Sequence, residues 1–240
     1  VITHRTILTQ GVGESVLSDT IESWETQLPS HMKLAYLPSP GMVRLRISAR
    51  GNDSEKLREE IELQTRELYA LIGDHIYGEG EVKMAEVIQG LMLERKLSLS
   101  VAESCTGGNI AHMITEIPGS SAYFLGGAVT YSERLKEEVL KVPNECIRTY
   151  GVVSEQTATA MAEGAIKTFK SDYSIAVTGV AGPDGGTESL PVGSIWIAVS
   201  GPAGTIAKLF RFSTHRERNI VMASQSALNM LRRILIQNRN

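Results

Sequence analysis

The sequence has only two cysteines in 240 residues, Cys105 and Cys146, and neither belongs to a CxxC pair or a Cys/His cluster. This pattern argues against a disulfide framework and against a cysteine-ligated metal site. The five histidines also lack the spacing of metal ligands. We therefore expect a reduced protein that holds neither a metal ion nor an organic cofactor.

Long apolar runs and an excess of one charge are missing as well. No run of roughly 18 apolar residues occurs, and the first residues do not resemble a signal peptide, so we expect a cytoplasmic protein without membrane contact. The net charge is only −3, with 24 Lys+Arg against 27 Asp+Glu interspersed along the chain. Protein surfaces that bind nucleic acid are usually strongly basic, and this chain has no basic excess. We therefore expect no nucleic-acid partner. The 42% hydrophobic content is enough to bury a sizeable core.

Residues 1–77 are expected to form a small α+β domain of one open sheet and two helices. Strand-like alternation and capping residues predict, in order, strand 6–9, helix 15–25, strands 32–37 and 42–47 joined by a turn at 38–41, and a helix from 52–54 to about 72. This part is acidic, since residues 1–80 carry eight Lys+Arg against twelve Asp+Glu. The polar, glycine-rich passage 73–81 marks the expected domain boundary.

Residues 78–240 alternate helix and strand patterns and predict an α/β domain, a sheet covered by helices. The expected helices are 82–96, 106–114, 133–140, 154–169 and one from about 216, and the expected strands are 97–102, 127–131, 173–178, 194–199 and 207–212. Ligands of such sheets gather at the carboxyl ends of strands, where loops and helix N-termini converge. Polar residues at these ends are therefore candidates for the functional site.

Four such residues, Ser104, Ser121, Tyr131 and Lys136, fall at breaks between expected elements. A hydroxyl nucleophile with a lysine base is the chemistry they offer. Lys136 lies near the start of its helix, where the helix dipole and partial burial both lower the pKa of a lysine. Each serine can equally be a helix cap, and the lysine a surface residue. A short-chain dehydrogenase needs its lysine four residues after the tyrosine, whereas the separation here is five.

Two glycine-containing segments can approach a ligand closely. Thr106 and Gly107 follow Ser104, and Thr178 opens a loop that contains Gly182, Gly185 and Gly186. Successive glycines allow backbone N–H groups to face an anion such as phosphate, and Arg216, at the start of the last helix, can contact phosphate too. A tight structural turn and a surface arginine are the alternatives.

Taken in order, AESCTGG, GSSA, VTYS with Lys136, TGVAGPDGG and PVG resemble the C-terminal domain of the CinA (competence/damage-inducible protein) family over about residues 82–238. The preceding segment is similar to the KH-type domain of longer CinA proteins, although residues 1–80 contain no GXXG loop for RNA. Those longer proteins carry a further N-terminal molybdopterin-binding-like domain, and we expect no counterpart of it within residues 1–240. The approach to Arg216 departs from the family, because THR stands where GDR-like residues are common.

The resemblance implies an enzyme that hydrolyses nicotinamide mononucleotide to nicotinate mononucleotide and ammonia. It implies Ser121 as the nucleophile, Lys136 as the base, and Tyr131 and Ser104 as orienting or relay groups. The nucleotide is then bound by Thr106, Gly107, Thr178, Gly182, Gly185, Gly186 and Arg216. The family also implies a homodimer or a higher homo-oligomer. The alternative is a nucleotide-binding or scaffolding module that keeps the pocket without turnover.

Overall fold

The computed structural model describes residues 1–237, so the last three residues of the domain expected over 78–240 lie outside the described part. The chain divides into two compact units, Val1–Met84 and Ala85–Asn240. The expected fold class, a small α+β part followed by a larger α/β part, is confirmed. Within residues 1–237 no helix is both long and apolar enough to cross a membrane.

The first unit contains one four-stranded antiparallel sheet, in the order β2-β3-β1-β4. Its elements are β1 (Ile2–Gln10), α1 (Glu14–Glu25), β2 (Met32–Ser39), β3 (Met42–Arg50), α2 (Ser54–Ile72), the short 3₁₀ helix η1 (Gly73–His75) and β4 (Ile76–Glu79). The sequence pattern missed β4, because it is short and lies in a glycine-rich passage. Strand β4 pairs with β1 and therefore belongs to the first unit. The domain boundary expected between residues 77 and 78 would divide this strand.

Period-two alternation in β3 builds the core of this unit. Val43, Leu45 and Ile47 are buried on one side of the strand, while the intervening arginines are exposed. The buried faces of α1 and α2 pack onto the same cluster. The N-terminus of α2 is capped by Asp53, whose carboxylate accepts hydrogen bonds from two backbone N–H groups of the first turn.

The second unit contains a five-stranded sheet in the order β6-β5-β7-β8-β9. Its elements are α3 (Met84–Glu94), β5 (Leu99–Glu103), α4 (Asn109–Thr115), the 3₁₀ helix η2 (Ser120–Ala122), β6 (Phe124–Val129), α5 (Glu133–Leu140), α6 (Asn144–Tyr150), α7 (Glu155–Phe169), β7 (Tyr173–Gly179), β8 (Ser194–Gly201), β9 (Gly204–Arg211) and α8 (Arg216–Gln237). Helix α6, only seven residues long, was not predicted. The first three strands of the order are mutually parallel, and β8 and β9 are antiparallel to their neighbours.

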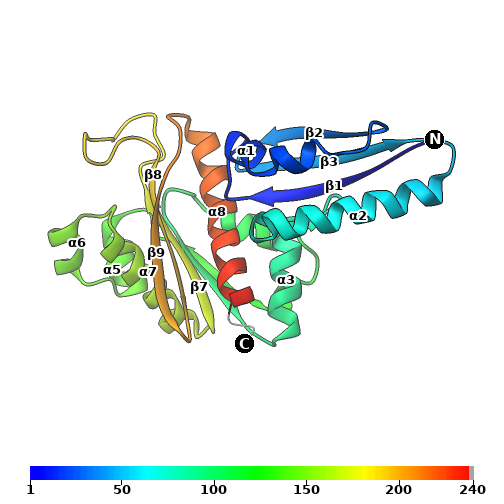
Figure 1. Ribbon diagram of the computed structural model, residues 1–240. Coiled ribbons are helices and arrows are strands. Elements are labelled where there is room, and N and C mark those ends of the chain that lie inside the picture. Colours follow the sequence, from blue (N-terminus) through cyan, green and yellow to red (C-terminus); the bar gives the residue numbers. More distant parts are fainter. Residues whose placement is uncertain (238–240) are drawn as a thin grey trace. The chain divides into compact units, whose positions relative to one another are not determined.

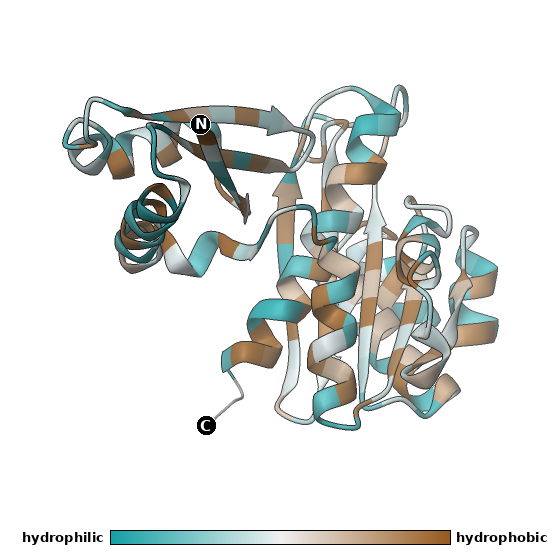
Figure 2. Cartoon of the chain, turned by 90° about the vertical axis from the view of Figure 1, so that its right-hand side faces the viewer, coloured by the Kyte–Doolittle hydropathy of each residue, from teal (hydrophilic) through white to brown (hydrophobic). Residues whose placement is uncertain are grey.

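Helices cover both faces of this sheet. Figure 1 shows α7, with α5 and α6, on one side of the strands and α8 on the other. Hydrophobic and hydrophilic bands alternate along the helices in Figure 2, as expected of helices with one buried face. The layer under α7 consists largely of alanines, among them Ala102 on β5 and Ala176 on β7, so that helix and sheet approach closely.

Gly164 of α7 brings α5 into this layer. A Cβ atom at Gly164 would stand 2.0 Å from the carbonyl oxygen of Leu140, the last residue of α5. Only a glycine allows the two helices to lie this close. The contact fixes the end of the helix that carries Lys136.

Candidate active site

The side-chain nitrogen of Lys136 and the hydroxyl of Ser104 meet at the carboxyl edge of the parallel strands. Lys136 Nζ lies 3.0 Å from Ser104 Oγ, within hydrogen-bond distance. Ser104 directly follows β5, and Lys136 lies in the first turn of α5, whose N-cap is Ser132. The pairing is parallel between β5 and β6, so the residues after both strands emerge at the same edge.

Lys136 is fully buried, with 0% of its surface exposed. Burial lowers its pKa from the ordinary value of 10.5, and the neighbouring Cys105 and Glu133 oppose this shift only in part. Nζ also donates to the carbonyl oxygens of Thr130 at 2.5 Å and Tyr131 at 3.5 Å. A neutral amine has two hydrogens for these carbonyls and one lone pair, which is then free to accept the Ser104 proton.

The turn that follows Ser104 is tightly folded and partly lacks internal partners. Thr106 is 2% exposed, and its buried Oγ1 has no hydrogen-bond partner among the described residues. Gly107 and Gly108 both have positive φ angles, 63° and 99°, a region that favours glycine. The hydroxyl of Thr106 is therefore buried without a partner at this turn, and its expected contact with the nucleotide stays a prediction.

The structure corrects the expectation that Ser121 pairs with Lys136. Ser121 lies in η2, which precedes β6, whereas Thr130 and Lys136 follow β6. A strand of this length spans about 20 Å, so Ser121 lies at the opposite edge of the sheet. Its side chain is exposed there, and Ser104 occupies the place next to the lysine that the sequence interpretation gave to Ser121.

Tyr131 and Arg216 meet on the outer side of the Ser104–Lys136 pair. The guanidinium of Arg216 donates to the Tyr131 hydroxyl at 3.1 Å and to the carbonyl of Gly182 at 2.7 Å. Tyr131 is 61% exposed. Because a guanidinium carries five N–H donors, Arg216 keeps further donors for a ligand. The structure thus brings three of the expected site residues, Tyr131, Gly182 and Arg216, into one hydrogen-bonded group.

The remaining residues of the glycine loop have mainly structural contacts. The Thr178 hydroxyl is buried and donates to the carbonyl of Val152 at 2.8 Å, so its hydrogen is already used. A Cβ atom at Gly186 would stand 2.7 Å from the backbone nitrogen of Val192. Gly185 is exposed, with a φ of 88°. Because a side chain at Gly186 would collide with Val192, this glycine is needed for the loop to fold onto the segment before β8.

Asn219 was missed by sequence analysis although it organises this loop. It is fully buried in the first turn of α8, and its amide donates to the carbonyls of Ala181 at 2.9 Å and Ser213 at 2.8 Å. Its oxygen accepts from the backbone N–H of Ser213 at 3.0 Å. The loop after β7, the segment after β9 and the helix that begins with Arg216 are thereby joined. An isolated asparagine in an amphipathic helix carries no sequence signal for this role.

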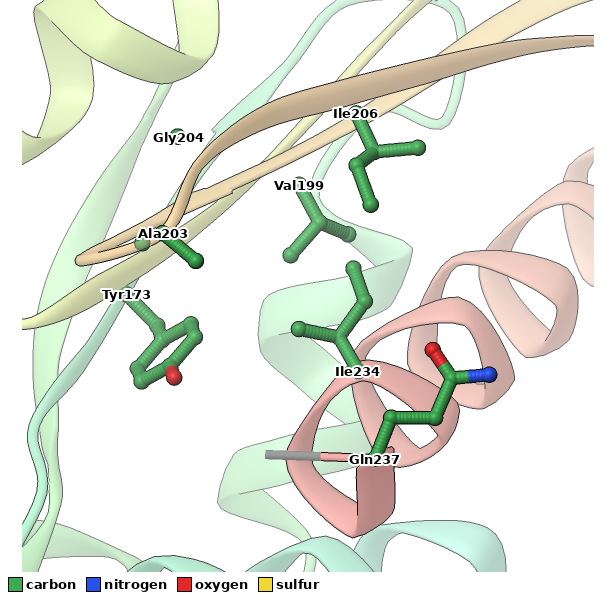
Figure 3. Close-up of a pocket in the computed structure, with 8 residues that line it drawn as sticks. Tyr173, Val199, Ala203, Gly204, Ile206, Ile234 and Gln237 are labelled. Atoms are coloured by element: carbon green, nitrogen blue, oxygen red, sulfur yellow. The ribbon is translucent and has the colours of Figure 1, made fainter. Parts of the chain in front are cut away.

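A cavity lies at the opposite edge of the same sheet and contains none of the expected site residues. It is lined by Tyr173, which begins β7, by the turn between β8 and β9, and by Ile234 and Gln237 of α8 (Figure 3). Its walls are mostly aliphatic, so it offers little chemistry. Among residues 1–237 no group of three or more His, Cys, Asp or Glu side chains is arranged to hold a metal ion.

Two family models match the chain, one for each unit. The CinA C-terminal domain matches residues 81–235 and the KH domain of damage-inducible protein CinA matches residues 4–78. Among curated proteins, the CinA-like protein of Flavobacterium psychrophilum is 48% identical over 99% of this chain, and that of Cytophaga hutchinsonii is 41% identical over 98%. The chain spans 57% and 56% of the length of these two relatives.

Solved structures resemble a little under two thirds of the chain. A competence/damage-inducible protein from Agrobacterium tumefaciens is 39% identical with a TM-score of 0.60, over 62% of this chain and 91% of that one. A competence damage-inducible protein A from Klebsiella pneumoniae is 32% identical with a TM-score of 0.62, over 64% of this chain and 95% of that one. The site described above lies in the part of the chain that the C-terminal family model covers.

Proposed function

The chain belongs to the CinA family, and we propose that its second unit is an amidohydrolase that converts nicotinamide mononucleotide and water to nicotinate mononucleotide and ammonia. The observation that carries this proposal is the 3.0 Å contact between Ser104 Oγ and the buried Lys136 Nζ. A hydroxyl paired with a lysine of lowered pKa is an activated nucleophile suited to acyl transfer. A carboxamide is the acyl group that the family resemblance implies.

In the first half of the reaction Ser104 Oγ attacks the carboxamide carbon while its proton passes to Lys136 Nζ. The tetrahedral intermediate then collapses, the bond from carbon to nitrogen breaks, and Lys136 returns the proton to the departing nitrogen, which leaves as ammonia. An ester between Ser104 and the nicotinoyl group remains. Before the proton transfer, the two carbonyls that hold Nζ keep the lone pair of the neutral amine directed at Ser104.

In the second half a water molecule attacks the ester carbon, and Lys136 accepts its proton. The bond to Ser104 Oγ breaks, and the proton returns to Ser104 as nicotinate mononucleotide is released. During both halves negative charge develops on the substrate oxygen. The backbone N–H groups of Cys105 and Thr106 come directly after Ser104 in the chain. Neither donates to a backbone carbonyl within the described residues, so both can stabilise this negative charge.

The phosphate of the nucleotide is assigned to Arg216. This guanidinium is held by the Tyr131 hydroxyl and the Gly182 carbonyl, and a guanidinium fork binds phosphate through two parallel hydrogen bonds. The net charge of the chain is low, so this local cation supplies the recognition. Dimerisation, which the family implies, remains part of the proposal.

The test is ammonia release from nicotinamide mononucleotide by the wild-type chain and by Ser104→Ala. We expect release by the wild type and none above background by the variant. Tight binding of the nucleotide without ammonia would instead support a binding or scaffolding module. Full activity of Ser104→Ala would overturn the mechanism.

A further inference from the structure

The carboxylate of Glu103, the residue before Ser104, is buried and accepts three hydrogen bonds from backbone N–H groups. Glu103 is 1% exposed. Its Oε2 accepts from the backbone N–H groups of Gly108 and Ile110, both at 3.1 Å, and its Oε1 accepts from that of Ala111 at 2.9 Å. These donors are the free N–H groups at the start of α4, which otherwise have no partner within the helix.

The backbone of Glu103 is anchored on its other side. Its carbonyl oxygen accepts from the N–H of Thr130 at 2.8 Å, and the carbonyl of Thr130 in turn accepts from Lys136 Nζ. Ser104 is the next residue in the chain and contacts the same nitrogen. Three hydrogen bonds and the peptide bond between Glu103 and Ser104 therefore close a ring. The ring runs through Glu103, Thr130, Lys136 and Ser104.

We propose that Glu103 is a positioning residue, whose carboxylate holds the 104–108 turn against α4 and so keeps Ser104 Oγ at hydrogen-bond distance from Lys136 Nζ. The kinetic part of this inference rests on the proposed amidohydrolase function. A further consequence is that the start of α4 is already occupied by a negative charge of the protein. The substrate phosphate is thereby kept away from Ser104 and left to Arg216.

Glu103→Gln tests this role with little change in volume. The carboxamide has one acceptor oxygen, so if that oxygen keeps Gly108 and Ile110, its NH₂ group faces the N–H of Ala111, donor against donor. The turn then shifts, and a shift of about 1 Å at a nucleophile costs on the order of 100-fold in rate. We expect kcat to fall about 10- to 100-fold while KM stays within about twofold, because the Arg216 side is untouched.

Ser100→Ala is the matched control. Ser100 lies on the same strand, is fully buried, and loses one hydrogen bond to the Ser171 hydroxyl when substituted. It is expected to lower stability but to leave kcat within about twofold. Glu103→Asp, which keeps the charge and is shorter by one methylene, is expected to give an intermediate kcat and serves as the second variant if Glu103→Gln does not fold.

Hydrogen–deuterium exchange of the 104–111 backbone is measured on the same proteins. Faster exchange there in Glu103→Gln, and not in Ser100→Ala, together with the loss of kcat, supports the proposal. Wild-type kcat in Glu103→Gln, or a loss that only follows the folded fraction with unchanged exchange, overturns it. If the wild type releases no ammonia, the proposed function fails, and the exchange result alone then decides whether Glu103 holds the turn.

Discussion

Lys136 Nζ lies 3.0 Å from Ser104 Oγ, although 32 residues separate the two in sequence, and this contact is made inside the protein. Both side chains emerge after parallel strands, where the turn after β5 meets the start of α5. Lys136 has lost its solvent shell here and is held against one specific hydroxyl. The predictions below separate this pair from its surroundings.

Substitution of the two candidate serines distinguishes the two possible nucleophiles. Ser104→Ala is expected to lower kcat for ammonia release at least about 1,000-fold, because Ser104 supplies the hydroxyl that contacts Lys136 Nζ. Ser121→Ala is expected to stay within about twofold, since Ser121 is exposed at the other end of β6. The check is a steady-state ammonia assay on both purified variants. The reverse order of effects would restore Ser121 as the nucleophile.

Lys136→Met removes the base and changes the pH dependence of stability. Burial lowers the pKa of Lys136 in the folded state, so the unfolded chain binds this proton more tightly and the free energy of unfolding rises with pH. Relative to Lys136→Met, the wild type is expected to gain stability as pH rises through the window between its lowered pKa and 10.5. A pKa that is lower by one in the folded state corresponds to a gain of about 1.4 kcal/mol across that window.

Urea unfolding of both proteins between pH 6 and 10.5 measures this difference. Stability curves that stay parallel across the window would show that the lysine keeps an ordinary pKa. In the same variant ammonia release is expected to disappear, because Met cannot accept the Ser104 proton. Retained turnover would remove Lys136 from the mechanism.

Arg216→Ala is expected to raise KM for nicotinamide mononucleotide about 10- to 100-fold with a small change in kcat, because a charge-assisted phosphate contact is lost. The same variant is expected to treat the nucleoside that lacks the phosphate as the wild type does. Arg134→Ala is the control, since Arg134 is 74% exposed and pairs with Glu138 on the surface of α5. Equal effects on both substrates would place the phosphate elsewhere.

Asn219→Ala is expected to lower the free energy of unfolding by about 3 kcal/mol, because the buried carbonyl of Ala181 and the half-buried carbonyl and N–H of Ser213 lose their partner. Denaturant unfolding measures the change. Asn144→Ala removes a comparable but exposed hydrogen bond to Glu137 and is expected to change stability by less than about 0.5 kcal/mol. Similar losses in both variants would argue against Asn219 as the tie between the two loops.

Hydrophobic periodicity in the sequence correctly predicted most elements of both units. Helix 133–140 coincides with α5, and Ser154, expected as an N-cap, accepts from the backbone N–H of Thr157 at the start of α7. Short elements were lost, because the four residues of β4 and the seven of α6 are too few to show a period. Sequence patterns also failed to identify buried polar residues such as Asn219, because their hydrogen-bond partners are backbone groups far away in the chain.

The sequence by itself determined that hydroxyls, one lysine and glycine-rich turns stand at the ends of strands, because this follows from local patterns of polarity. It did not determine which serine meets Lys136. Ser121 is only 15 residues from the lysine and Ser104 is 32 away, yet the nearer serine in sequence is the farther one in space. Parallel pairing of β5 with β6 decides this, because it brings the carboxyl ends of both strands to one edge and leaves the residues before β6 at the other.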